Sequence, residues 1–256
     1  MALEKPLVTV IVRQSREPRM LADCLESIAL QTYAPIETIL VHDGTASITD
    51  ELNGISIKPR LKLVEVQPPR GLAASGNAGL AHARGEYISF LDDRSYLYPW
   101  HFQSLMDAIR FRTERIIYSD SVRADQAKLP YGEHNYSTVS LLLERSLDLT
   151  SETLLDYDRF PLLSVLFSKR VFESGIRFDP LLEELADWDL LVGISKTEAF
   201  FHLVDITGEY KWTPEDEQLQ SLFKLTRNWS RAYIATKHSL KLQASAARST
   251  AMNIGN

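Results

Sequence analysis

The chain lacks any long hydrophobic run, because no stretch approaches about 18 consecutive apolar residues. We therefore predict no transmembrane segment, and residues 1–6 lack the profile of a signal peptide. The chain has a single cysteine, Cys24, which excludes an internal disulfide. Its place in an apolar-periodic stretch favours a small core residue over a nucleophile. These absences predict a soluble, cytoplasmic protein.

An excess of positive charge is also absent. The formal net charge is −6, which gives no electrostatic reason to expect nucleic acid or an anionic membrane as a partner. Internal repeats and low-complexity linkers are missing as well. With 256 residues, 45% hydrophobic and 24% charged, the composition is that of one sizeable globular α/β domain, with or without a helical appendage.

Strand-like and helix-like segments alternate in the first half of the chain. Expected strands cover residues 7–12, 37–41, 61–66, 87–91 and 116–118, and expected helices begin at Pro18, Ala73 and near Pro99. Such alternation is typical of βαβ units and a largely parallel sheet. In these sheets the binding crevice lies beyond the carboxyl ends of the strands, which highlights residues 13–16, 42–45 and 92–95.

The second half is less regular. Residues 161–167 and 200–206 could be strands, and residues 187–194 a short helix. Thr213 and Pro214 have the character of an N-cap and a first helical residue, so a helix could run from there to about Leu242. This amphipathic helix either packs on its own domain or docks on a partner protein.

Four segments in order resemble family 2 glycosyltransferases of the GT-A fold. Residues 8–18 match the family's first strand and nucleotide loop. Residues 27–33 and 37–44, S-I-A-L-Q-T-Y and E-T-I-L-V-H-D-G, are similar to its S-x-x-x-Q-T-Y and E-I-I-V-V-D-D-G-S. Residues 71–80 and 83–93 resemble its G-x-x-x-A-R-N-x-G and A-x-G-E-Y-I-x-F-L-D-x-D-D, and residues 186–190, A-D-W-D-L, its E-D-W-D-L. The four segments span about three quarters of the chain.

The resemblance implies a Rossmann-like, mostly parallel mixed sheet flanked by helices. Residues 1–213 would form the GT-A domain, with a nucleotide-binding half at 1–120 and an acceptor half at 121–213. Residues 214–256 would form a C-terminal helical extension. The implied reaction is inverting transfer of one sugar from a nucleotide-sugar, commonly a UDP-sugar, to a hydroxyl. The acceptor would be a glycan, a lipid-linked sugar or a protein, as in polysaccharide biosynthesis.

The resemblance also assigns residues. Asp187 matches the family's general base, although Ala186 replaces the glutamate that usually precedes it. Asp43 would accept a hydrogen bond from the uracil N–H, although an aspartate before Gly44 is also a common turn residue. Asn77 matches a residue of the nucleotide site.

The turn at residues 92–95 departs most from the family pattern. Relatives hold a divalent cation here, Mn²⁺ or Mg²⁺, and Asp92 and Asp93 remain as candidate ligands. Arg94 stands where relatives usually place the aspartate that binds the metal, and a guanidinium cannot be a ligand. Three interpretations stay open. Arg94 supplies the positive charge for the diphosphate itself, the site has decayed, or the aspartates merely cap the turn into a following helix.

Other positions depart from the pattern too. Gly76 replaces the arginine that normally precedes Asn77. The loop after the first strand reads Arg13-Gln14-Ser15-Arg16, without the aromatic residue that stacks on uracil in relatives. Arg13 and Ser15 remain candidates for holding the donor from another side. Two functions follow: a single-addition glycosyltransferase, or a catalytically degenerate GT-A module that acts as a binding or scaffold domain.

Overall fold

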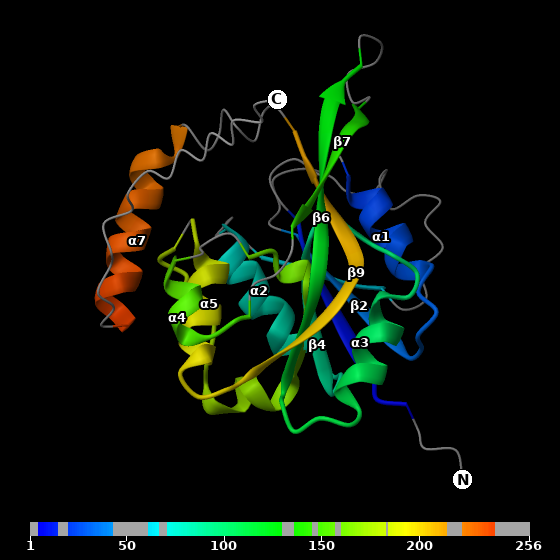
Figure 1. The fold of residues 1–256 in the computed structure, drawn as a ribbon, viewed down its shortest axis with the longest axis horizontal. Coiled ribbons are helices and arrows are strands. Elements are labelled where there is room, and N and C mark those ends of the chain that lie inside the picture. Colours follow the sequence, from blue (N-terminus) through cyan, green and yellow to red (C-terminus); the bar gives the residue numbers. More distant parts are fainter. Residues whose placement is uncertain are drawn as a thin grey trace, which may run out of the picture.

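A computed structural model describes most of the chain. The described residues are 5–14, 20–42, 61–66, 71–129, 136–144, 148–156, 160–182, 184–213 and 222–238. They form one sheet with helices on both faces (Figure 1). The predicted Asp43 and Ser15 lie outside the described residues.

The first half of the chain builds parallel strands. It contains β1 (Val8–Arg13), α1 (Leu21–Ala29), β2 (Ile36–His42), β3 (Leu61–Glu65), α2 (Gly71–His82) and β4 (Tyr87–Asp92). β1 pairs in parallel with both β2 and β4, and β3 continues the sheet beside β2. This confirms the predicted βαβ pattern. It also places Arg13 and Asp92, which are register partners, together at the carboxyl ends of β1 and β4.

The second half adds mostly antiparallel strands. It contains β5 (Ser95–Leu97), α3 (His101–Ile109), β6 (Ile116–Lys128), β7 (Tyr136–Glu144), α4 (Ser151–Asp156), β8 (Val165–Ser168), α5 (Ala186–Ser195), β9 (Phe200–Trp212) and α7 (Lys224–His238). Two 3₁₀ segments, Leu162–Ser164 and Lys169–Ser174, flank β8. The sheet order is β3-β2-β1-β4-β8-β6-β9-β5, with β7 paired to β6. The sheet is therefore mixed as expected, but its parallel strands are concentrated in the first half.

Two apolar clusters lie on opposite faces of the sheet. One joins Ile11 and Phe90 to α2, α4 and α5, and the other joins Val10 and Val12 to α1 and α3. Alternate residues of the central strand β1 enter different clusters because successive side chains point to opposite faces. Cys24 is fully buried in the second cluster, as predicted, and burial raises the pKa of its thiol.

Glu37 ties β1, β2 and the start of β4 together, a role that the sequence did not indicate. Its Oε1 accepts hydrogen bonds from Thr9 Oγ1 at 2.6 Å and from the Arg84 N–H at 2.7 Å. Its Oε2 accepts one from Arg84 Nε at 2.8 Å. Burial disfavours the charged carboxylate, but these hydrogen bonds outweigh it and lower the pKa of Glu37. The glutamate therefore holds together the amino-terminal ends of these strands, opposite the ends that carry Arg13 and Asp92.

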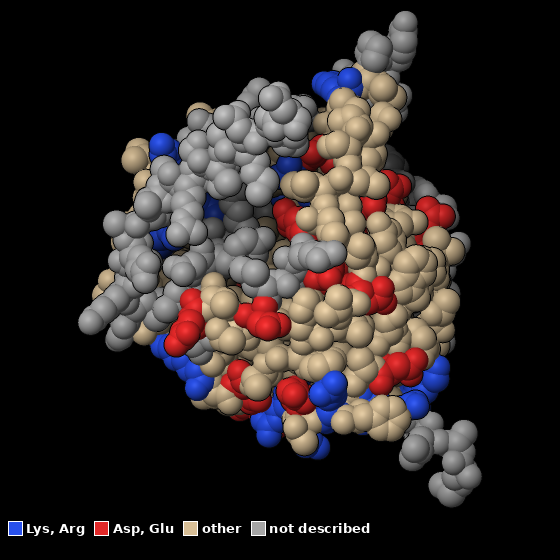
Figure 2. Space-filling model, in the orientation of Figure 1, with Lys and Arg blue, Asp and Glu red and all other residues tan. Residues whose placement is uncertain are grey.

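The described helices include none that is long and apolar enough to span a lipid bilayer. On the face shown in Figure 2, acidic side chains are spread over the middle, and basic ones lie mainly along the lower margin. The described part of this face thus carries no continuous basic band of the kind that tracks a phosphate backbone.

Candidate functional site

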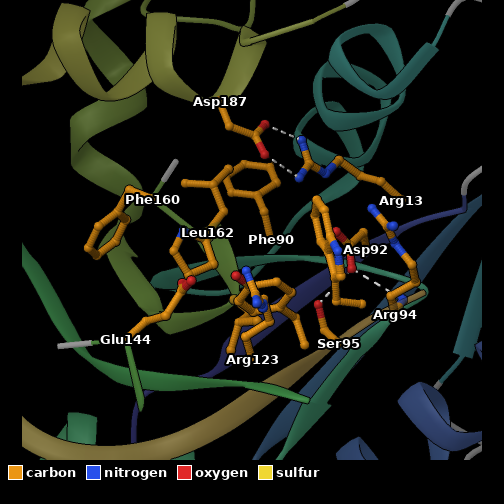
Figure 3. Close-up of a pocket in the computed structure, with 14 residues that line it drawn as sticks. Arg13, Phe90, Asp92, Arg94, Ser95, Arg123, Glu144, Phe160, Leu162 and Asp187 are labelled. Carbon is orange, nitrogen blue, oxygen red and sulfur yellow. Dashed lines mark hydrogen bonds and ion pairs between the residues drawn. The ribbon is translucent and has the colours of Figure 1, made fainter. Parts of the chain in front are cut away.

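A pocket of about 180 Å³ opens at the carboxyl ends of β1 and β4. Arg13, Asp92 and Arg94 line one side, and Arg123 of β6 and Glu144 of β7 lie on the other (Figure 3). Tyr210 and Trp212 of β9 also line the pocket. Asp187 enters from the first turn of α5. The volume is below the roughly 300–1,000 Å³ of a typical ligand site, so the pocket suits the reacting end of a substrate rather than a whole nucleotide-sugar.

Arg13 and Asp187 form a bidentate ion pair in this pocket. Arg13 Nη1 donates to Oδ1 of Asp187 at 2.5 Å, and Nη2 donates to Oδ2 at 2.9 Å. Burial disfavours the charged form of Arg13, but the charges of Asp187 and Asp92 outweigh it, so the pKa of the guanidinium is raised. The Asp187 side chain stays 34% exposed, and each of its oxygens keeps a lone pair for another donor.

An aromatic ring supports Arg13. The guanidinium carbon lies 5.3 Å from the centroid of Phe178, which packs edge-on against Phe90 at 5.0 Å. Asn77 fixes the backbone of Phe178, because its side chain accepts from Phe178 N at 3.0 Å and donates to Phe178 O at 2.9 Å. A Cβ at Gly76 would lie 2.6 Å from the Phe178 ring. Gly76 therefore makes room for the ring under Arg13.

The two aspartates of the turn after β4 lie in different surroundings. Oδ1 of Asp92 accepts from Arg94 N at 3.1 Å and from Ser95 Oγ at 2.9 Å, so this carboxylate shapes the turn. Asp93 is completely buried and does not line the pocket, whereas Arg94 does. The turn leads into strand β5 and not into a helix, so the expectation that it caps a following helix was wrong. The carboxylate hydrogen bonds stabilise a β-turn instead.

The turn offers few oxygen ligands to the expected divalent cation. Mn²⁺ and Mg²⁺ take oxygen ligands, commonly one or two carboxylates together with substrate phosphates and water. Asp92 already uses Oδ1 within the turn, and the positive guanidinium of Arg94 lines the same pocket. Over the described ranges, no group of three or more His, Cys, Asp or Glu side chains is arranged to hold a metal ion.

Residues that the sequence did not single out form the opposite side of the pocket. Arg123 donates through Nε to Asp125 Oδ1 at 2.8 Å, and its guanidinium lies 5.7 Å from the Trp212 ring. Glu144, the last residue of β7, lies on the same side (Figure 3). A run of β-branched and leucine residues at 138–143 was the available signal for this strand.

The family model described as glycosyl transferase family 2 matches residues 9–163, more than half of the chain. The chain belongs to glycosyl transferase family 2. The uncharacterized glycosyltransferase EpsJ of Bacillus subtilis (strain 168) is 35% identical over 104 residues, which cover 40% of this chain and 30% of EpsJ. The chain thus spans less than a third of that relative's length.

Solved structures show the same GT-A fold. S. aureus TarS 1–349 in complex with UDP superposes with a TM-score of 0.65 at 15% identity, over 91% of this chain and 70% of that chain. The mannosyltransferase PcManGT from Pyrobaculum calidifontis, in complex with GDP-Man and Mn²⁺, gives a TM-score of 0.55 at 19% identity. That superposition covers 80% of this chain and 57% of that one. The predicted GT-A fold is therefore confirmed.

Within this family 2 domain, the structure brings some of the predicted site residues together and separates others. Four of them line the pocket: Arg13, Asp92, Arg94 and Asp187. Asn77 and Asp93 do not line it. Nucleotide binding by Asn77 stays a prediction that this geometry does not favour, because the Asn77 amide is hydrogen-bonded to Phe178. Nucleotide or metal binding by Asp93 also stays a prediction that it does not favour, because the Asp93 carboxylate is buried.

The C-terminal helix is fastened to the segments that carry the site. Lys237 of α7 donates to Asp179 Oδ2 at 2.8 Å and to Asp189 Oδ2 at 2.7 Å. Asp179 follows Phe178, and Asp189 lies two residues after Asp187 in α5. Packing of α7 on its own domain was one of the two expectations, and the buried side chains of Ile234 and Ala235 confirm it. A protein partner for this helix stays a prediction.

Lys237→Met should remove the hydrogen bonds that join α7 to Asp179 and Asp189. We expect a loss of about 1–3 kcal/mol in unfolding free energy, because Asp179 and Asp189 would each lose the charge-assisted hydrogen bond from the lysine. Hydrogen exchange measured by mass spectrometry should rise in α7 and α5. The matched control is Lys224→Met, an exposed lysine on the same helix. Equal exchange in both variants would contradict this role of Lys237.

Proposed function

We propose that this domain transfers a single sugar from a nucleotide-sugar to an acceptor hydroxyl, with inversion at the anomeric carbon. The observation that carries the proposal is the orientation of Asp187. Its carboxylate is held by a buried arginine at the pocket, yet remains partly exposed there. Membership of glycosyl transferase family 2 supports the same reaction.

Asp187 acts as the general base. The acceptor oxygen loses its proton to a free lone pair of the carboxylate as it bonds to the anomeric carbon. The bond from that carbon to the diphosphate oxygen breaks on the opposite face, and the diphosphate leaves with the electron pair. Arg13 holds the carboxylate in one orientation through its two hydrogen bonds. A fixed orientation matters because a misplacement of about 1 Å costs roughly 10²-fold in rate.

Arg94 stabilises the departing diphosphate. Its side chain lines the pocket from the turn that relatives use for a metal. A guanidinium matches phosphate oxygens with paired hydrogen bonds and carries a permanent positive charge. In this proposal, Arg94 supplies the charge that a divalent cation supplies elsewhere.

The donor is proposed to be a UDP-sugar. The resemblance favours UDP, and the structure of TarS holds UDP, although PcManGT holds GDP-Man with Mn²⁺. The acceptor is a hydroxyl of a glycan, a lipid-linked sugar or a protein. The proposed boundaries of residues 1–213 and 214–256 follow from the same resemblance.

One observation favours the second function, a non-catalytic binding module. Arg13 engages both oxygens of Asp187, so an acceptor hydroxyl would have to share a carboxylate that already accepts two hydrogen bonds. A domain that kept its fold but lost turnover would tolerate such a pair. Nucleotide binding separates this alternative from a transferase.

Calorimetric titration with UDP and GDP tests the proposal. We expect UDP to bind with an affinity that EDTA and Mn²⁺ leave unchanged, because Arg94 provides the charge. Arg94→Ala should weaken UDP binding by about 10–100-fold, the loss expected for charge-assisted hydrogen bonds. Arg170→Ala, an exposed arginine outside the pocket, is the matched control.

Two outcomes would contradict the proposal. Loss of UDP binding in EDTA would mean that a cation carries the diphosphate, and Arg94 would lose its role. Failure of both nucleotides to bind, with and without Mn²⁺, would contradict the transferase and favour the binding module.

A further inference from the structure

Glu144 has a buried oxygen that no other group satisfies. Within the described part of the chain, its Oε2 atom is buried and has no hydrogen-bond partner. A buried carboxylate oxygen without a partner costs free energy, about 1–3 kcal/mol or more, unless a ligand or water supplies a donor. The pocket is the place from which such a donor can come, since Glu144 lines it.

The strand register places two aromatic residues on the same face of the sheet as this oxygen, on the other side of β6. Ser121 pairs with Glu144 across β6 and β7, and Arg123 and Asp125 of β6 pair with Tyr210 and Trp212 of β9. Residues 121, 123 and 125 alternate along β6 and point to one face, so their partners share that face. Glu144, Tyr210 and Trp212 accordingly line the same pocket.

Arg123 is already committed to a neighbouring side chain. It forms an ion pair with Asp125 at 2.8 Å, and its guanidinium lies 5.7 Å from the Trp212 ring. Among the described residues, the hydrogen bonds of this arginine go to Asp125 and not to Glu144. Arg123 thus lies against the indole of Trp212, and the hydrogen bond to Glu144 Oε2 can come from a ligand.

We propose that Glu144 and Trp212 form a subsite for the acceptor sugar. Oε2 of Glu144 accepts a hydrogen bond from a ring hydroxyl, and the apolar face of the sugar lies against Trp212. The subsite deepens the proposed function, on which the identity of the ligand as acceptor rests. Glu144 lies on the opposite side of the pocket from Arg13 and Asp187 (Figure 3), so the acceptor would reach the base across the pocket.

A sugar fits this chemistry better than a lipid chain. A pyranose ring presents hydroxyl donors at its edge and C–H groups on its faces, which match a carboxylate oxygen and an aromatic surface together. An alkyl chain would cover Trp212 but leave the Glu144 oxygen buried without a donor. The ligand class is therefore a neutral, hydroxyl-rich glycoside.

The test uses methyl glycosides of the common hexoses and N-acetylhexosamines as probes, with UDP present at saturation. Binding is measured by saturation-transfer NMR and calorimetry on the full chain. We expect at least one glycoside to bind, and Glu144→Gln to weaken it about 10–100-fold while UDP affinity stays unchanged. Trp212→Ala should weaken the binding of the same glycoside.

Glu209→Gln is the matched control, because it makes the same change on β9, where Glu209 accepts a hydrogen bond from Tyr98 outside the pocket. If UDP binds but no glycoside does, or if Glu144→Gln binds glycosides as the parent chain does, the subsite is wrong. If glycosides bind through Glu144 but no nucleotide binds, the subsite stands and the transferase proposal fails.

Discussion

Asp187→Asn should reduce sugar transfer by about 10²–10⁴-fold, the usual contribution of a general base. The amide has nearly the shape of the carboxylate but cannot take the acceptor proton. It also removes the larger of the two negative charges that act on the buried Arg13, so some stability should be lost as well. Transfer is measured as product formed per folded molecule, with the folded fraction taken from urea denaturation.

UDP titration distinguishes a lost base from a lost site. UDP should bind Asp187→Asn as it binds the parent chain, because the carboxylate contacts the acceptor side of the reaction. Asp107→Asn on α3, an exposed aspartate that interacts with Gln103, is the matched control. Transfer by Asp187→Asn at the parental rate would show that another group is the base.

Gly76→Ala should destabilise the domain by about 1–3 kcal/mol, the typical cost of overpacking a core. The new Cβ would lie 2.6 Å from the Phe178 ring, which is already packed between Arg13 and Phe90. The ring cannot retreat without disturbing the Arg13–Asp187 pair, so the rate of transfer should fall together with stability. Urea denaturation and single-turnover transfer measure the two effects.

Gly193→Ala supplies a control of the same chemistry. Gly193 is also inside a helix, and the nearest atom to its new Cβ is His238 Cε1 at 3.6 Å, an ordinary contact. This substitution should be neutral or should stabilise by up to about 1 kcal/mol through helix propensity. If both glycine variants gain stability equally, the packing of Phe178 against Gly76 does not limit the stability of the domain.

The first half of the fold could be predicted because its signals are local. The continuous apolar run at residues 7–12 and the stripe of Leu21, Leu25 and Ile28 reveal a buried strand and a helix without knowledge of their partners. The same reasoning missed β7, which lies at the sheet edge with largely exposed side chains. It also shortened β6, because residues 119–128 are largely polar although most of them are buried.

The C-terminal helix shows how an amphipathic pattern can mislead. Of the apolar residues that the sequence offers for packing in this stretch, Tyr233 packs against the core, but Leu222 is 77% exposed. The buried face instead carries Ser230, Ile234 and Ala235, which lie against the domain. The helix is positioned by Lys237 and its two carboxylate partners, which periodicity does not reveal.

The sequence by itself determined the family, the Rossmann-like half and Asp187 as the candidate base. These depend on short motifs and on periodicities that neighbouring residues create. Only the tertiary structure decided that Asp187 pairs with Arg13, which lies 174 residues away, and that Gly76 makes room for Phe178 beneath that pair. The physical reason is that parallel strands bring their carboxyl ends to one edge of the sheet, where distant segments meet. Contacts of that kind leave no periodic trace along the chain.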